Sequence, residues 1–166
     1  MLTAQEALIR LQEGNKRFVE GKSTYNTSYK HRRNELVDGQ TPFAIILGCS
    51  DSRVPAEIVF DQGLGDLFVI RIAGNIVAPS QIGSVEFAVE TFQTPLVVVL
   101  GHTGCGAVAA TLNQIRQPQA SRSQHLHSIV ERIRPAVEPL LEIRTDLTHE
   151  HLLERAIRSN VRMSVN

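Results

Sequence analysis

The chain has 166 residues, with 17 lysines and arginines against 17 aspartates and glutamates, so its formal net charge is zero. This length suits one domain with its own core, and the charge balance gives no argument for a nucleic-acid or membrane-surface partner. No apolar run is long enough to span a membrane, we see no secretory leader, and two cysteines are too few for a secreted disulfide scaffold. We therefore expect a cytoplasmic protein, or one in a cytoplasmic microcompartment.

The first predicted element is a helix over residues 3–20. Thr3 and Glu6 have the spacing of a capping box at its start, and apolar residues then recur on one face. A long polar connection follows this helix. We expect an N-terminal helical arm over residues 1–40 that projects from an α/β core over residues 41–166 and packs elsewhere, for example on a second subunit. The two parts form a single domain overall.

Three short apolar runs come next, and segments of helical periodicity separate or follow them. The runs cover residues 43–47, 67–72 and 95–100. Two of them are almost continuously aliphatic, as in strands that are covered on both faces. Alternating strands and helices indicate βαβ units. The predicted fold class is therefore α/β with three layers: a central, mainly parallel β-sheet flanked by helices, with a projecting N-terminal helical arm.

Apolar stripes predict the helices that follow. The stripes cover residues 82–92, 108–115 and 126–133. A polar loop is expected at 118–124, and the helix after it is expected to be interrupted at Pro135. A last amphipathic helix begins near Thr148 and runs to Asn166 without a glycine cap or a stop signal. We therefore expect the chain to be cut within or just after this helix.

Two polar stretches follow the first and third apolar runs. GCSDSR contains Cys49 and Asp51, and GHTGC contains His102 and Cys105. Ligands of parallel α/β sheets bind beyond the carboxyl ends of the strands, so these side chains converge if the two strands are neighbours. Two thiolates and one imidazole are a known zinc set, and three protein ligands leave a fourth position open, as in catalytic sites. The sequence predicts Zn²⁺ on Cys49, His102 and Cys105.

Asp51 and Arg53 suit a catalytic role beside such a metal. Two thiolates cancel the charge of Zn²⁺, so a bound water is less acidic there than in a three-histidine site. Asp51 can accept a hydrogen bond from bound hydroxide, or occupy the fourth position itself in a closed form. Arg53 can hold the Asp51 carboxylate in a bidentate pair.

The two cysteines and the histidine are also compatible with simpler roles. Either cysteine alone, or His102 alone, is better explained as a structural residue. A redox disulfide between Cys49 and Cys105 is a further alternative, but it leaves His102, Asp51 and Arg53 without a role. An alcohol dehydrogenase would use the same ligand types, yet no G-x-G-x-x-G lies between a strand and a helix.

The stretches CSDSRVPAE, GDLFVIRIAGNIV and GHTGCGAV resemble the β-class carbonic anhydrases, and the resemblance covers roughly the whole chain. It implies reversible hydration of CO₂ to bicarbonate and a proton by a zinc-bound hydroxide, with one Zn²⁺ per chain. It implies that Cys49, His102 and Cys105 are the metal ligands and that Asp51 and Arg53 are the catalytic dyad of the motif. It also implies a homodimer or higher homo-oligomer with the site near the dimer interface.

Two substrate-binding residues are implied by the resemblance alone. Gly106 matches a glycine whose backbone amide borders the substrate pocket. Gln62 matches a glutamine that plant-type members present to substrate across the dimer interface.

The resemblance also has two departures. The bicarbonate-inhibited branch has a tryptophan three residues before the first cysteine, where this chain has Ile46 and no tryptophan anywhere. We expect that pocket to be missing and the zinc to be open and water-bound at alkaline pH. Members usually continue into a further strand, so the chain looks truncated at its C-terminus. The alternative function is therefore a catalytically weak or inactive zinc or redox-sensing protein of the same fold.

Overall fold

The structure is a computed structural model that describes residues 2–24, 29–117, 123–143 and 148–166. The chain forms two compact units. The first consists of Met1–Leu47, Ser52–Ile70 and Pro79–Val98, and the second of Gly48–Asp51, Arg71–Ala78 and Val99–Asn166. The boundaries between the units fall inside each of the three described strands, after Leu47, Ile70 and Val98.

The first unit holds most of a three-stranded sheet with the order β2-β1-β3. The strands are β1 (Ala44–Gly48), β2 (Leu67–Arg71) and β3 (Val97–Leu100). The Phe43 N–H donates to the Asp66 carbonyl at 2.9 Å and the Ile72 N–H to the Gly48 carbonyl at 3.0 Å. The two chains therefore advance in the same direction, and the parallel sheet is confirmed. β1 is buried along its whole length, because it is the central strand.

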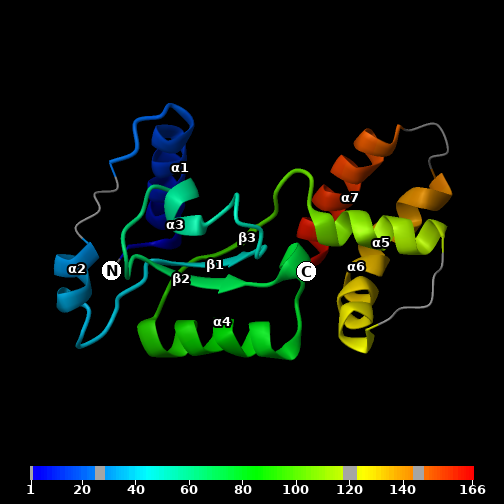
Figure 1. Ribbon diagram of the computed structural model, residues 1–166. Coiled ribbons are helices and arrows are strands. Elements are labelled where there is room, and N and C mark those ends of the chain that lie inside the picture. The colour runs from blue at the N-terminus through cyan, green and yellow to red at the C-terminus, as the bar shows by residue number, and fades with distance from the viewer. Residues whose placement is uncertain (1, 25–28, 118–122, 144–147) are drawn as a thin grey trace. The chain divides into compact units, whose positions relative to one another are not determined.

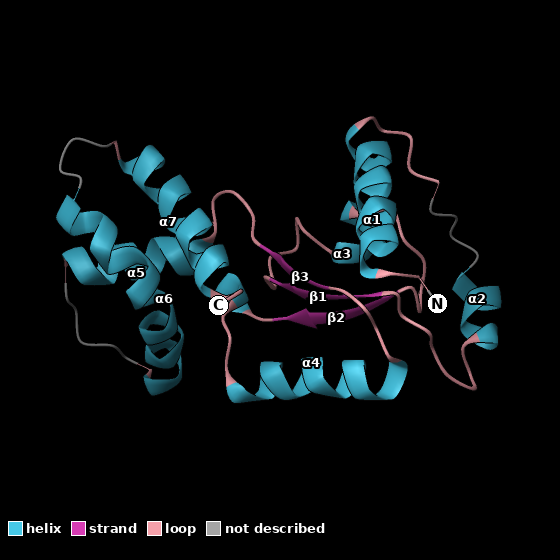
Figure 2. Cartoon of the chain, turned by 180° about the vertical axis from the view of Figure 1, so that it is seen from behind, coloured by secondary structure: helices cyan, strands magenta, loops and turns pink. Residues whose placement is uncertain are grey.

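Helices cover both faces of the sheet in the first unit. The helices of this unit are α1 (Ala4–Val19), α2 (Tyr29–Glu35), α3 (Ala56–Val59) and α4 (Pro79–Phe92), and α1, α3 and α4 lie along the faces. Figure 1 shows α4 along one face and α1 with α3 on the other, and Figure 2 shows the same layers from behind. This arrangement confirms the three-layer α/β class.

The N-terminal helix begins as predicted. Thr3 and Glu6 form both halves of the capping box, which satisfies amides that have no partner inside the helix. Ala7 and Leu11 are buried, and the helix packs against α3 of the same chain. At Gly14 a side chain would run into the Phe60 carbonyl, so a small residue is needed where the two elements approach.

In its described residues, the second unit is built from three helices and a 3₁₀ turn. They are η1 (Ala73–Asn75), α5 (Gly106–Arg116), α6 (Gln124–Ile143) and α7 (His149–Met163). The helices pack on one another, as Figure 2 shows. Their core includes Val108, Ile133 and Leu152, and it also contains Cys49 and Cys105.

The predicted interruption at Pro135 is wrong, because α6 continues through Pro135 and Pro139 to Ile143. Each proline removes one helical hydrogen bond. Ile133 and Val137, on either side of the first proline, are completely buried, and α6 packs on both α5 and α7. That packing outweighs the lost hydrogen bonds.

The last helix is confirmed, with Thr148 as its N-cap, and it ends at Met163 rather than at Asn166. Of the loop expected at 118–124, residues 118–122 lie outside the described part of the chain. Within the described residues, no helix is both long and apolar enough to cross a membrane.

Candidate metal centre

Three possible metal ligands meet in the second unit. Cys49 follows β1, and His102 and Cys105 follow β3, which is the neighbour of β1 in the sheet. One ligand atom from each residue, the two Sγ atoms and an imidazole nitrogen, lies within 4.8 Å of the other two. Both thiols are free rather than joined in a disulfide. The structure thus brings together the three residues that the sequence proposes as zinc ligands.

Cys49 is buried, and both its side chain and its backbone carbonyl accept hydrogen bonds. Its Sγ accepts a hydrogen bond from the Gly74 N–H at 3.3 Å. Its carbonyl accepts from Arg71 Nε at 3.1 Å, and Arg71 Nη2 donates to the Asp51 carbonyl at 2.6 Å. Arg71 therefore ties down the backbone from which both Cys49 and Asp51 project. Sequence reasoning missed Arg71; its signal is a charged residue at the end of an otherwise apolar strand.

The His102 ring is oriented by its own loop. Its Nδ1 lies 3.0 Å from the Thr103 carbonyl, and since a carbonyl can only accept, Nδ1 carries the hydrogen. The neutral ring then has its lone pair on Nε2, the nitrogen that can bind a metal. Nε2 lies 3.9 Å from Asp51 Oδ2, and the His102 side chain is only 5% exposed. Asp51 thus approaches the metal-binding side of the imidazole.

Cys105 lies just before the first turn of α5. Burial raises the pKa of its thiol above the ordinary value of 9.0, although the Val108 amide acts to lower it, and nearby Cys49 adds to the rise. The metal-free site therefore favours the protonated thiol. A divalent cation would reverse this preference, because it stabilises the thiolate directly.

The remaining candidate residues are placed as follows. Gly106 is the first residue of α5, and the space where a side chain would stand is open. Arg53 is exposed. Gln62 belongs to the first unit and is buried there, with its Nε2 donating to the Phe60 carbonyl at 2.7 Å.

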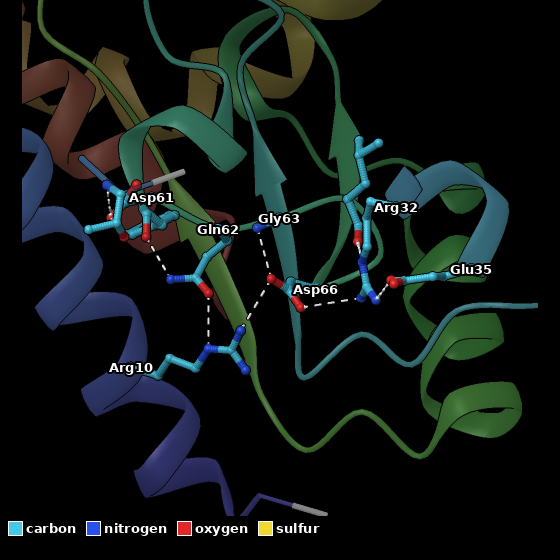
Figure 3. A network of polar contacts seen from close by, with 10 residues as sticks. Arg10, Arg32, Glu35, Asp61, Gln62, Gly63 and Asp66 are labelled. Atoms are coloured by element: carbon cyan, nitrogen blue, oxygen red, sulfur yellow. Dashed lines mark hydrogen bonds and ion pairs between the residues drawn. The ribbon is translucent and has the colours of Figure 1, made fainter. Parts of the chain in front are cut away.

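Figure 3 shows what surrounds Gln62. Arg10 Nε donates to Gln62 Oε1 at 3.0 Å, and Arg10 Nη2 lies 3.2 Å from Asp66 Oδ2. Arg10 also lies 4.1 Å from the centre of the Phe43 ring. The amide of Gln62 is therefore held at both of its polar atoms by its own chain.

The donor set fits zinc. Ligand atoms that bind a tetrahedral zinc at about 2.0–2.3 Å are roughly 3.3–3.8 Å apart, which is compatible with a cluster whose ligand atoms all lie within 4.8 Å of one another. Two sulfurs with one imidazole suit a soft to borderline metal rather than Mg²⁺ or Ca²⁺. Three ligands leave a fourth position, which is the arrangement of catalytic sites.

Comparisons with known proteins agree with this chemistry. A family profile described as carbonic anhydrase matches residues 44–166. A carbonic anhydrase of Mycolicibacterium smegmatis is 46% identical over 127 residues, which are 76% of this chain and 61% of that protein. The chain thus spans about three fifths of the length of that relative.

Solved structures show the same fold. The β-carbonic anhydrase CcaA matches with a TM-score of 0.74 and 28% identity, over 95% of this chain and 71% of that chain. Tetrameric β-carbonic anhydrases of Sordaria macrospora match with a TM-score of 0.67 and 26% identity, over 95% of this chain and 78% of that chain. Together with the profile match, they show that the chain belongs to the carbonic anhydrase family, in its β class.

Proposed function

We propose that the chain catalyses the reversible hydration of CO₂ to bicarbonate and a proton, with one Zn²⁺ on Cys49, His102 and Cys105. The observation that carries the proposal is the cluster of two thiols and one imidazole in a member of this family. When bound, zinc lowers the pKa of a water molecule and so supplies a nucleophile near neutral pH.

Asp51 and Arg53 are proposed to act beside the fourth position. The Asp51 carboxylate approaches His102 Nε2, so it can accept a hydrogen bond from a group at that position, or occupy the position itself in a closed form. Arg53 is proposed as the second member of this catalytic dyad. Ile46, which stands where the bicarbonate-inhibited branch has a tryptophan, is completely buried in β1. Because that tryptophan is absent, we expect the fourth position on zinc to be open to water at alkaline pH.

Gly106 and Gln62 are proposed to bind substrate. The Gly106 amide belongs to a helix N-terminus, where backbone N–H groups stabilise an anion such as bicarbonate, and open space adjoins it. Gln62 is proposed to reach substrate across the dimer interface, with the amide hydrogen that does not bind the Phe60 carbonyl.

A homodimer or higher oligomer is part of the proposal. The tetrameric relatives support it, as do exposed apolar side chains on α4, among them Ile82, Phe87 and Val89. Both thiols are free of disulfides. Free thiols are typical of reducing compartments, which supports a cytoplasmic location.

The proposal is tested by zinc content and by stopped-flow CO₂ hydration at about pH 8.5. The purified chain is expected to hold about one zinc and to be active. His102→Ala should lose the zinc and at least about 100-fold in rate, since a ligand matters no less than its supporting residues. His125→Ala, on the exposed side of α6, should retain both. One zinc per chain without activity would instead identify a non-catalytic zinc protein.

A further inference from the structure

A polar side chain interrupts the apolar face with which α7 packs. Asn160 is 2% exposed and continues the spacing of the buried residues Leu152 and Ala156. Burying an amide is costly unless it is hydrogen-bonded. Asn160 Nδ2 donates to the Gly74 carbonyl at 2.8 Å. The amide therefore serves one specific contact, with η1.

Gly74 connects this contact to the metal centre. Its N–H is the donor to Cys49 Sγ at 3.3 Å. Its φ of 68° lies in the left-handed region, and a β-carbon there would stand 2.7 Å from Ile133 Cδ1 and 3.0 Å from Ala107 Cβ. Only glycine fits this position, and its backbone is confined by α5 and α6 as well as by α7.

The end of α7 holds the next residue of η1 too. Ser164, the C-cap of α7, lies four residues after Asn160, and its Oγ donates to the Asn75 carbonyl at 3.1 Å. The Asn75 N–H closes the turn onto the Ile72 carbonyl at 3.0 Å. Two successive carbonyls of η1, those of Gly74 and Asn75, are thus held from α7, immediately after the Gly74 N–H.

We propose that Asn160 is a positioning residue of the metal centre. It fixes η1 so that the Gly74 N–H donates to Cys49 Sγ, and it thereby sets how strongly this thiolate donates electrons to the metal. The inference rests on the proposed zinc site and deepens it. Hydrogen bonds to ligand sulfurs tune metal centres in this way.

The test uses the full chain loaded with Co²⁺, which takes the same ligands and absorbs visible and near-ultraviolet light. Asn160→Leu keeps the size of the side chain and removes the donor. The thiolate-to-cobalt charge-transfer band should move to longer wavelength, because the sulfur then holds its electrons less tightly. Co²⁺ should also bind about tenfold more weakly, the usual cost of losing a supporting residue.

Leu152→Ala is the matched control, because Leu152 is buried on the same face of α7. It should lower the unfolding temperature and leave the band in place. If Asn160→Leu does not fold, Asn160→Ser takes its place, since its shorter side chain ends before the position of Nδ2.

The outcomes separate the two proposals. No charge-transfer band in the unaltered chain would refute the cysteine metal site itself. A band and an affinity that are unchanged in a folded Asn160 variant would refute the positioning role. An equal shift in Leu152→Ala would also refute it, because the effect would then come from general loss of packing.

Discussion

At Cys105, burial raises the pKa of the thiol, whereas metal binding lowers it. Because burial raises the folded-state pKa above 9.0, the protonated thiol stabilises the metal-free fold below that pH, and this contribution is lost as the pH rises through the folded value. Zinc must displace this proton. The zinc affinity should therefore rise with pH, by about tenfold per unit for this thiol below its pKa. Chelator competition at several pH values measures it, and an affinity independent of pH would contradict the argument.

Loss of the Arg71 side chain should disturb the segment 49–51, from which Cys49 and Asp51 project, without removing a metal ligand. Arg71→Ala deletes the hydrogen bonds to the Cys49 and Asp51 carbonyls, so zinc should bind about tenfold more weakly. Arg71→Lys should lie between, because an ammonium lacks the planar fork that reaches both carbonyls. Arg134→Ala, which removes an arginine paired with Glu131 on α6, is the control for loss of charge. Equal zinc affinity in all three variants would refute the role of Arg71.

At the scale of elements, α7 approaches the loop 101–105, which carries His102 and Cys105, very closely at Gly101. A side chain there would run into Val161, so Gly101→Ala should lower the free energy of unfolding by about 1–3 kcal/mol through overpacking. Adding Val161→Ala should recover much of that loss, because it removes the group that is struck. Urea unfolding of the two single variants and the double variant measures this coupling. Strictly additive effects would show that α7 does not pack on this loop.

The sequence predicted the three strands and most of the long helices, but it missed the shortest helices for a physical reason. Apolar periodicity is repeated over several turns in α1, α4, α5 and α7, so it identifies them without tertiary information. The four-residue α3 and the three-residue η1 are too short to show a period. The course of α6 depends on burial of Ile133 and Val137, which local rules for proline do not include.

At the scale of the whole molecule, the metal ligands were predictable because topology brings them together. Cys49 and His102 are far apart in sequence, but each follows a strand, and carboxyl ends of neighbouring parallel strands meet at one edge. The support of the site was not predictable in this way. Arg71 and Asn160 act through backbone carbonyls, and such contacts leave no spacing pattern in the sequence.

The metal cluster and its supporting contacts lie entirely within the second unit, so removing zinc should affect the two units unequally. Zinc at a thousandfold excess over its Kd stabilises the folded state by about 4 kcal/mol. After chelation, amide hydrogen exchange should speed up in the segments 48–51, 71–78 and 99–117. Exchange in α1 and α4 should change little, because neither helix belongs to that unit.

The His102→Ala chain is the control for the chelator, since it lacks a ligand and should show no further change. If amide exchange in α1 and α4 sped up as much as in the segment 48–51, zinc would stabilise the chain only as a whole. The supporting contacts of the second unit would then have no independent effect.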